Sequence, residues 1–189
     1  MFRSGRMRLT RTLQWVVLIG AIQCSGMGWA QAPAARESAV KAAFLSKFAG
    51  FVEWPAGTLT QPEAPLVIGV VASDDVAADL QLIAAARSTQ LRPIVVRRLP
   101  DGNGSTGVHI LFIGATRDSR VRELAGLARG PVLVVTEQED GLLVGGVLNF
   151  VLDQGRVRFA ASPTAADARG LRLSARLLAL AQSVEGRVR

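Results

Sequence analysis

The residues that could support chemistry are few, and most of them lie in the middle of the chain. The segment from Gly102 to Gly107 reads GNGSTG and matches the G-x-G-x-x-G motif of dinucleotide-binding proteins. That motif has to follow a strand and open a helix, so that the pyrophosphate meets the helix N-terminus. Here it precedes a predicted strand at 109–113, so we interpret it as a loop.

Metal and nucleophile chemistry is poorly represented. His109 is the only histidine and Cys24 the only cysteine, and Cys24 lies in a predicted leader segment. The mature chain therefore offers no thiolate, and we predict no metal site. A Ser-His-Asp triad needs its histidine at a loop or cleft. His109 instead opens a buried strand, where we expect a hydrogen-bonded structural role.

Two acidic residues follow the first predicted strand, as in receiver domains that accept a phosphoryl group. A receiver domain also needs an aspartate at the end of its third strand, where this chain has Gly114. We therefore assign Asp74 to capping a helix. No pair of carboxylates is spaced for acid–base catalysis. The sequence predicts a protein that is not an enzyme and uses no cofactor.

Small and hydroxyl-bearing residues follow three of the predicted strands. Ligands of open parallel sheets bind in the crevice beyond the carboxyl ends of the strands. The candidate ligand-crevice residues at this edge are Ser73, Gly114, Thr116 and Thr136. They suit a small anion or metabolite, and they suit helix caps and turns equally well.

The elements that position these residues follow from apolar patterning. Four continuous apolar runs have the composition of strands buried on both faces. They are residues 66–71, 94–96, 110–113 and 132–135. Two predicted helices separate some of these strands, one over 75–86 and one from Thr116 or Asp118 to Ala128. This alternation indicates an α/β fold with a largely parallel central sheet.

The C-terminal part has a different pattern. Residues 147–152 and 156–160 flank a Gly-containing loop and predict an antiparallel ribbon. A short helix at 163–169 and a final helix capped by Ser174 follow. The complete prediction is a single-domain layered sandwich with a largely parallel sheet, a C-terminal antiparallel ribbon and terminal helices.

Residues 38–53 predict an opening helix that Pro55 ends. Its large apolar residues, expected in the core, are Val40, Phe44, Phe48, Phe51 and Val52. Its opposite face is small, and we expect there either a homodimer or partner contact, or packing on the chain's own C-terminal helix. The interface candidates are Ala42, Ser46, Ala49 and Gly50, followed by Glu53 and a partly exposed Trp54.

The first 30 residues have the layout of a secretory signal peptide, with four arginines, a short apolar run at 13–22 and a small-residue junction at Ala30. The apolar run is too short to span a bilayer. We expect cleavage after Ala30, a short disordered start at 31–37, one domain at 38–183 and a tail at 184–189. The mature protein would be periplasmic, without direct membrane insertion.

Removing this leader changes the charge. It holds four of the 22 basic residues and none of the 15 acidic ones, which leaves 18 basic against 15 acidic residues. The remaining arginines are scattered, whereas a nucleic-acid binder needs a clustered basic face. We therefore expect no nucleic-acid partner.

Two segments at opposite ends of the domain carry distinctive motifs. Residues 40–55 read VKAAFL, then F, then FVEWP, and residues 145–181 contain GG, NF, RF, GLRLS and LLALA. In these motifs and their order the chain resembles the YfiR family of periplasmic proteins, over about residues 38–182. It implies a regulator that binds and represses the periplasmic domain of an inner-membrane diguanylate cyclase, which lowers cyclic di-GMP and biofilm formation.

The chain departs from the family pattern at several positions. Family cysteines correspond here to Gly69 and Val108, so the resemblance does not extend to redox sensing through a disulfide. A frequent tyrosine is Ser46, and a frequent Glu-Ile-Asn segment is 160–162 (AAS). The alternative function is a periplasmic domain that senses a small solute in the sheet crevice. The two functions are compatible if the solute changes the affinity for the partner.

Overall fold

The structure is a computed structural model that describes residues 32–59, 61, 63–87, 92–100 and 106–185. The strands in chain order are β1 (Val52–Glu53), β2 (Leu66–Val71), β3 (Ile94–Arg98), β4 (Ile110–Ile113), β5 (Leu133–Thr136), β6 (Leu148–Asp153), β7 (Arg156–Ala161), β8 (Arg172–Leu173) and β9 (Ser183–Val184). The helices are α1 (Ala32–Phe48), α2 (Asp74–Ala86), α3 (Asp118–Leu127), α4 (Pro163–Asp167) and α5 (Ala175–Leu180), with a 3-10 turn at Ala49–Phe51. The predicted signal peptide and most of the Gly102–Gly107 segment lie outside the described residues.

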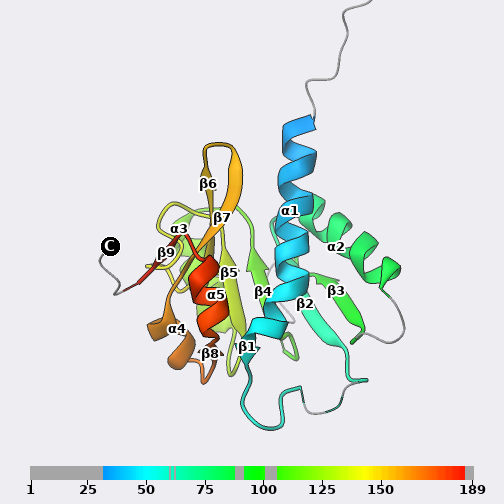
Figure 1. The fold of residues 1–189 in the computed structure, drawn as a ribbon, viewed down its shortest axis with the longest axis vertical. Helices are drawn as coiled ribbons and strands as arrows, with labels where there is room; N and C mark the ends of the chain where they lie inside the picture. Colours follow the sequence, from blue (N-terminus) through cyan, green and yellow to red (C-terminus); the bar gives the residue numbers. More distant parts are fainter. Residues whose placement is uncertain (1–31, 60, 62, 88–91, 101–105, 186–189) are drawn as a thin grey trace, which may run out of the picture. The chain divides into compact units, whose positions relative to one another are not determined.

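The strands of the described residues form two sheets (Figure 1). The larger has the order β3-β2-β4-β5-β6-β7-β9, and the smaller pairs β1 with β8. Strands β2 to β6 run parallel to their neighbours, whereas β7 is antiparallel to β6. This is an α/β fold with a largely parallel sheet and an antiparallel ribbon, as the sequence predicts.

The continuous apolar runs are explained by burial on both sheet faces. Successive side chains of a strand point to opposite faces. Ile110 and Phe112 pack in the core cluster under α1 and α2, while Leu111 and Ile113 pack in the cluster under α3. Each central strand therefore lies between two apolar layers.

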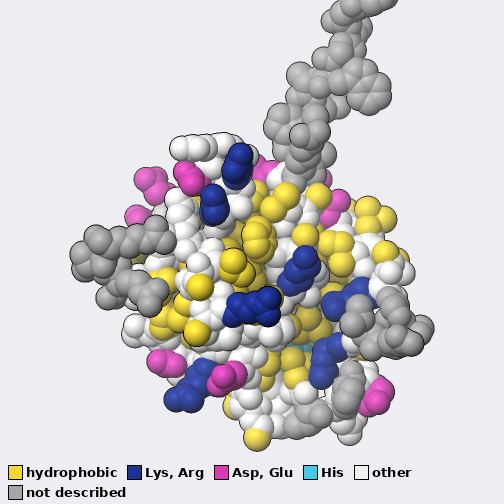
Figure 2. All heavy atoms as spheres, in the orientation of Figure 1, with side chains coloured by type: hydrophobic (Ala, Val, Ile, Leu, Met, Phe, Trp, Pro, Cys, Tyr) yellow, Lys and Arg dark blue, Asp and Glu magenta, His cyan; other side chains and the backbone are white. Residues whose placement is uncertain are grey.

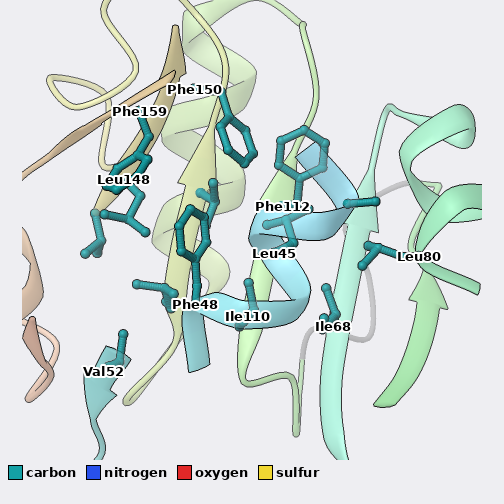
Figure 3. Packing of buried hydrophobic residues seen from close by; sticks show 14 of the residues in the cluster. Leu45, Phe48, Val52, Ile68, Leu80, Ile110, Phe112, Leu148, Phe150 and Phe159 are labelled. Atoms are coloured by element: carbon teal, nitrogen blue, oxygen red, sulfur yellow. The ribbon is translucent and has the colours of Figure 1, made fainter. Parts of the chain in front are cut away.

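Phenylalanines join α1 to the sheet (Figure 3). The Phe48 ring lies 5.3 Å from Phe159 and 5.9 Å from Phe150, and the Phe112 ring lies 5.9 Å from Phe150. Such ring pairs contribute roughly 0.5–1.5 kcal/mol each beyond their buried area. The aromatic cluster fixes α1 across β4, β6 and β7.

The ends of the opening helix differ from the prediction. Helix α1 begins at Ala32, inside the segment predicted to be disordered, and ends at Phe48. Val52 and Glu53, predicted as helical, are extended and pair with Leu173 and Arg172 of β8. Pairing with a strand about 120 residues away overrides the local helical pattern, so the prediction of a helix to residue 53 is wrong.

The helix caps are partly as predicted. Ser174 Oγ accepts a hydrogen bond from Leu177 N at 3.2 Å, which confirms the predicted cap of α5. Asp74, predicted as a cap, is instead the first residue of α2, and its Oδ1 accepts from Arg98 Nη1 at 2.9 Å. At the C-terminal end of the domain, Val184 belongs to β9, so the first residue of the predicted tail at 184–189 is part of a strand.

Candidate functional site

The small residues of α1 do not form an exposed face. Ala42 is fully buried and Ser46 is 9% exposed, while Ala49 is half-buried and Gly50 is exposed. The expectation that these four residues form one continuous interface is therefore wrong for Ala42 and Ser46. They lie in the chain's own interior.

Helix α2 covers this face of α1. Ser38 Oγ donates to Asp79 Oδ2 at 2.6 Å, and Arg87 Nη1 donates to the Ser46 carbonyl at 3.5 Å. Asp79 lies in α2 and Arg87 is its C-cap residue. The face therefore packs on α2 and not on the C-terminal helix. A homodimer through this face would require α1 to separate from α2.

The two interface candidates beyond α1 remain at or near the surface. Glu53 is exposed on β1, opposite Arg172 of β8. Trp54 is half-buried; its Nε1 donates to the Ala49 carbonyl at 3.2 Å, and its ring lies edge-on to His109 at 6.2 Å. The tryptophan is partly exposed, as predicted, and it ties the end of α1 to β4. Partner binding by these residues stays a prediction.

The predicted ligand crevice lies at the topological switch point of the sheet. The chain leaves β2 for β3 on one side and later returns to β4 on the other, and such points are where doubly wound sheets bind ligands. Ser73 and Gly114 follow these two strands. However, a Cβ atom on Gly114 would collide with the Ala72 carbonyl oxygen. The two loops already touch, so the space between them is closed.

The other crevice candidates differ in their exposure. Thr136 is fully buried, and its Oγ1 lies 2.8 Å from Asn149 Oδ1. Gly141 leaves no room for a Cβ against Asn149 and Thr136, so the loop after β5 closes over both side chains. Thr116 is half-buried. Ser73 lines a groove of about 470 Å³ that it shares with Asp74 and Arg98.

A charged cluster that the sequence analysis missed lies at this edge of the sheet. Lys41 Nζ is 2.5 Å from Glu37 Oε1 and 2.5 Å from Glu137 Oε2. Glu137 Oε1 also accepts from Ala115 N at 2.6 Å. The side chains of Lys41 and Glu137 are each 12% exposed. The cluster connects α1 to the ends of β4 and β5.

The electrostatics of this cluster favour the charged lysine. Burial by itself would lower the pKa of Lys41, but the hydrogen bonds and charges of Glu137 and Glu37 outweigh burial and raise the pKa above its ordinary value of 10.5. Lys41 is therefore a stable cation near neutral pH and a poor general base. We assign it a structural role.

A neutral polar network completes the closure of this edge. Gln138 Nε2 donates to the Gly114 carbonyl at 2.9 Å, and Asn149 Nδ2 donates to the Gln138 carbonyl at 2.8 Å. The sequence analysis did not place Gln138 or Asn149 at this edge. Gln138 follows the carboxyl end of β5, and Asn149 lies near the amino end of β6, where it pairs in register with Thr136.

His109 lies at the amino end of β4, away from this edge, and serves the fold. Its Nδ1 accepts from Val67 N at 3.0 Å. Burial is the main cause of its lowered pKa, the positive charge of Arg92 adds to it, and a hydrogen bond with the Thr58 backbone opposes both. An imidazole that accepts at Nδ1 is neutral. The predicted hydrogen-bonded structural role of His109 is confirmed.

Among the described residues, no group of three or more histidine, cysteine, aspartate or glutamate side chains is placed to hold a metal ion. Within the same ranges, every helix is too short or too polar to cross a membrane. The polar residues of the sheet edge bind one another. What the arrangement offers is a rigid body with exposed surfaces.

Comparison with known proteins gives a family. Residues 38–182 match the model of the YfiR/HmsC-like proteins. The chain belongs to this family. It is a family of periplasmic regulators in cyclic di-GMP signalling and not a catalytic family. The match extends over the parallel sheet, the ribbon and the helices that cover them.

Two solved structures share the fold. A conserved domain protein from Vibrio cholerae O1 biovar El Tor has a TM-score of 0.53 at 13% identity, with 78% of this chain and 60% of that chain covered. An ABC domain from Streptococcus pneumoniae in complex with L-Trp has a TM-score of 0.50 at 11% identity, with the same coverage of 78% and 60%. The chain thus spans about 60% of the length of each. No curated protein sequence matches the chain.

Proposed function

We propose that this YfiR/HmsC-like protein is exported by a signal peptide at residues 1–30 and then binds and represses the periplasmic domain of an inner-membrane diguanylate cyclase. Repression would lower cyclic di-GMP and reduce biofilm formation. The protein would act by occupying a surface of the cyclase and not by catalysis.

The closed edge of the sheet is the observation that carries this proposal. At the switch point, Gly114 touches the Ala72 carbonyl, and Thr136 is sealed under the loop that contains Gly141. A solute receptor of this topology would need space there. A protein-binding regulator needs only a rigid body with exposed surfaces, and membership of the family supports that role.

Affinity capture tests the partner. Tagged mature protein, starting at Gln31, is incubated with detergent-solubilised inner membranes, and the bound proteins are identified by mass spectrometry. We expect a diguanylate cyclase with a periplasmic domain, and we expect that purified domain to bind in calorimetry. Deleting the gene that encodes this protein should raise the cellular concentration of cyclic di-GMP. Absence of binding together with an unchanged cyclic di-GMP level would refute the proposal.

The export proposal has its own test. N-terminal sequencing of the protein from the periplasmic fraction should begin at Gln31, because the small-residue junction ends at Ala30. Recovery of the chain in the cytosol with Met1 intact would refute it without bearing on the fold.

The solute-sensing alternative has one observation in its favour. The groove of about 470 Å³ beside β2 and β3 carries Ser73, Asp74 and Arg98, and the streptococcal structure of similar fold holds L-Trp. Calorimetry of the mature protein with L-Trp tests this alternative. Saturable binding that Arg98→Ala weakens would support a solute site in this groove.

A further inference from the structure

The solvent side of α1 carries an apolar groove, which we call the α1 groove. It has a volume of about 350 Å³ and is lined by Ala39, Val40, Ala43, Phe44 and Lys47. Four of its five lining residues are apolar, and Val40 is 40% exposed. In Figure 2, hydrophobic side chains gather over this part of the molecule, with Lys and Arg side chains beside them.

The floor of the α1 groove is fixed to the ribbon. The Phe44 ring lies 5.7 Å from Phe159 and 6.1 Å from Phe150. On the same face of β6 as Phe150, two residues further along, Leu152 is 61% exposed. Adjacent exposed apolar groups on two rigid elements are typical of a protein-binding surface. The groove is preformed, because the aromatic cluster holds α1 and the ribbon together.

The charges around the α1 groove define the occupant. Lys47 is its single charged lining residue. Beyond the C-terminal end of α1, the Arg176 guanidinium lies 5.9 Å from the Phe51 ring centroid. Such a surface attracts a segment that carries carboxylates. A second copy of the chain fits poorly, because a two-fold contact of this patch with itself would bring the two Lys47 side chains to the same interface.

The side chains lining the α1 groove also suit a helical occupant. Ala39 and Ala43 are one turn apart on α1, and their small side chains permit close approach of a second helix between Val40 and Lys47. Amphipathic helices bind such grooves through apolar side chains on one face. We propose that the α1 groove binds a helix of the cyclase periplasmic domain, with apolar residues against Val40 and Phe44 and a carboxylate facing Lys47. This inference rests on the proposed function.

Charge-introducing variants test the inference. The purified periplasmic domain of the captured cyclase is titrated with mature protein carrying Val40→Asp or Lys47→Glu. We expect each change to weaken binding at least tenfold while the melting temperature stays within 2–3 °C of the wild type, since both positions are at the surface. Matched controls on α3, Leu127→Asp and Arg122→Glu, should bind within twofold of wild type; Leu127 is 46% exposed and Arg122 is exposed.

The outcomes separate this inference from the proposed function. If wild-type protein does not bind the cyclase domain, the function fails and the inference fails with it. If wild-type protein binds and the Val40 and Lys47 variants bind equally well, the inference alone is overturned.

A photo-crosslinking amino acid at position 40, activated in cells, gives an independent readout. An adduct containing the cyclase supports the inference. An adduct of two copies of this chain, or no adduct, overturns it.

Discussion

The two sides of α1 carry the same residue types in opposite settings. On the inner side, Phe48 is buried in the aromatic cluster and Lys41 is held by two glutamates. On the outer side, Phe44 lies half-buried and Lys47 is exposed at the α1 groove. Residue type alone therefore does not decide whether a side chain of α1 stabilises the fold or is available to a partner. The residues packed around each side chain decide this.

The inner side is sealed by contacts far apart in the chain. Lys41 meets Glu137, 96 residues later, and Phe48 meets the ribbon. The outer side has no equivalent long-range ion pair among the described contacts. We therefore expect the same substitution to lower the stability more on the inner side of α1 than on the outer side.

The largest difference is expected between the phenylalanines. Phe48→Ala should lower the free energy of unfolding by about 3–5 kcal/mol, the range for a buried aromatic truncated to alanine. Phe44→Ala should cost less, because its ring is half-buried. Urea unfolding followed by circular dichroism measures both. Equal losses would show that the outer side belongs to the core.

The lysines give the second comparison. Lys41→Ala should cost about 3 kcal/mol, because it leaves Glu137 with only 12% exposure and without its cation. Lys47→Ala should change stability by less than about 0.5 kcal/mol. Chemical unfolding at pH 7 measures both variants. Adding Glu137→Gln to Lys41→Ala should recover part of the loss, and its failure to do so would mean that Lys41 acts by packing.

The pH dependence of stability tests the charge of Lys41. The pKa of Lys41 is raised in the folded state, so its contribution to stability is complete below the ordinary value of 10.5 and is lost as pH rises through the raised pKa. The difference between wild type and Lys41→Ala should therefore stay constant from pH 6 to pH 9. A difference that changes within that window would contradict the assignment of Lys41 as a permanent cation.

Much of the fold follows from the sequence, for a physical reason. Strands buried on both faces must be apolar throughout, so β2, β4 and β5 can be predicted from continuous apolar runs. The ribbon can be predicted from its Gly-containing loop, and the start of α5 from Ser174. These features depend on residues that are close together in the chain, or on burial so complete that every side chain of the strand has to be apolar.

The candidate site was less predictable, because burial of α1 depends on distant elements. Val40 and Phe44 share an apolar stripe with Phe48, yet Val40 is exposed, since the sheet lies under the row that contains Leu45 and Phe48. Ala42 is buried because α2 packs over it. Periodicity finds the helix and its apolar residues, but only the positions of α2 and the ribbon decide which side remains open.

The alanines give a third and smaller comparison. Ala42→Leu should cost about 1–3 kcal/mol through overpacking, because Ala42 has no exposed surface. Ala39→Leu, three residues earlier, should leave stability within about 0.5 kcal/mol of wild type, because Ala39 is exposed. Thermal unfolding measures both. If Ala39→Leu lowers the stability and Ala42→Leu does not, the assignment of the inner and outer sides of α1 is reversed.

The smallest expected effect concerns the far end of the sealed side, where Trp54 links the Ala49 carbonyl to the His109 ring. The pKa of His109 is lowered, so the unfolded chain binds a proton more readily near the ordinary value of 6.5. Stability should therefore fall as pH drops below about 6.5 and level off below the lowered folded pKa. Protonation at Nδ1 also removes the acceptor for Val67 N.

His109→Asn tests this effect, because its side-chain oxygen can accept that hydrogen bond without titrating. The variant should flatten the change in melting temperature between pH 7.5 and pH 5, whereas Lys47→Ala should keep the wild-type profile. If His109→Asn keeps the wild-type profile too, the acid sensitivity arises from carboxylates elsewhere, and His109 does not contribute to the contacts that join the inner side of α1 to β4.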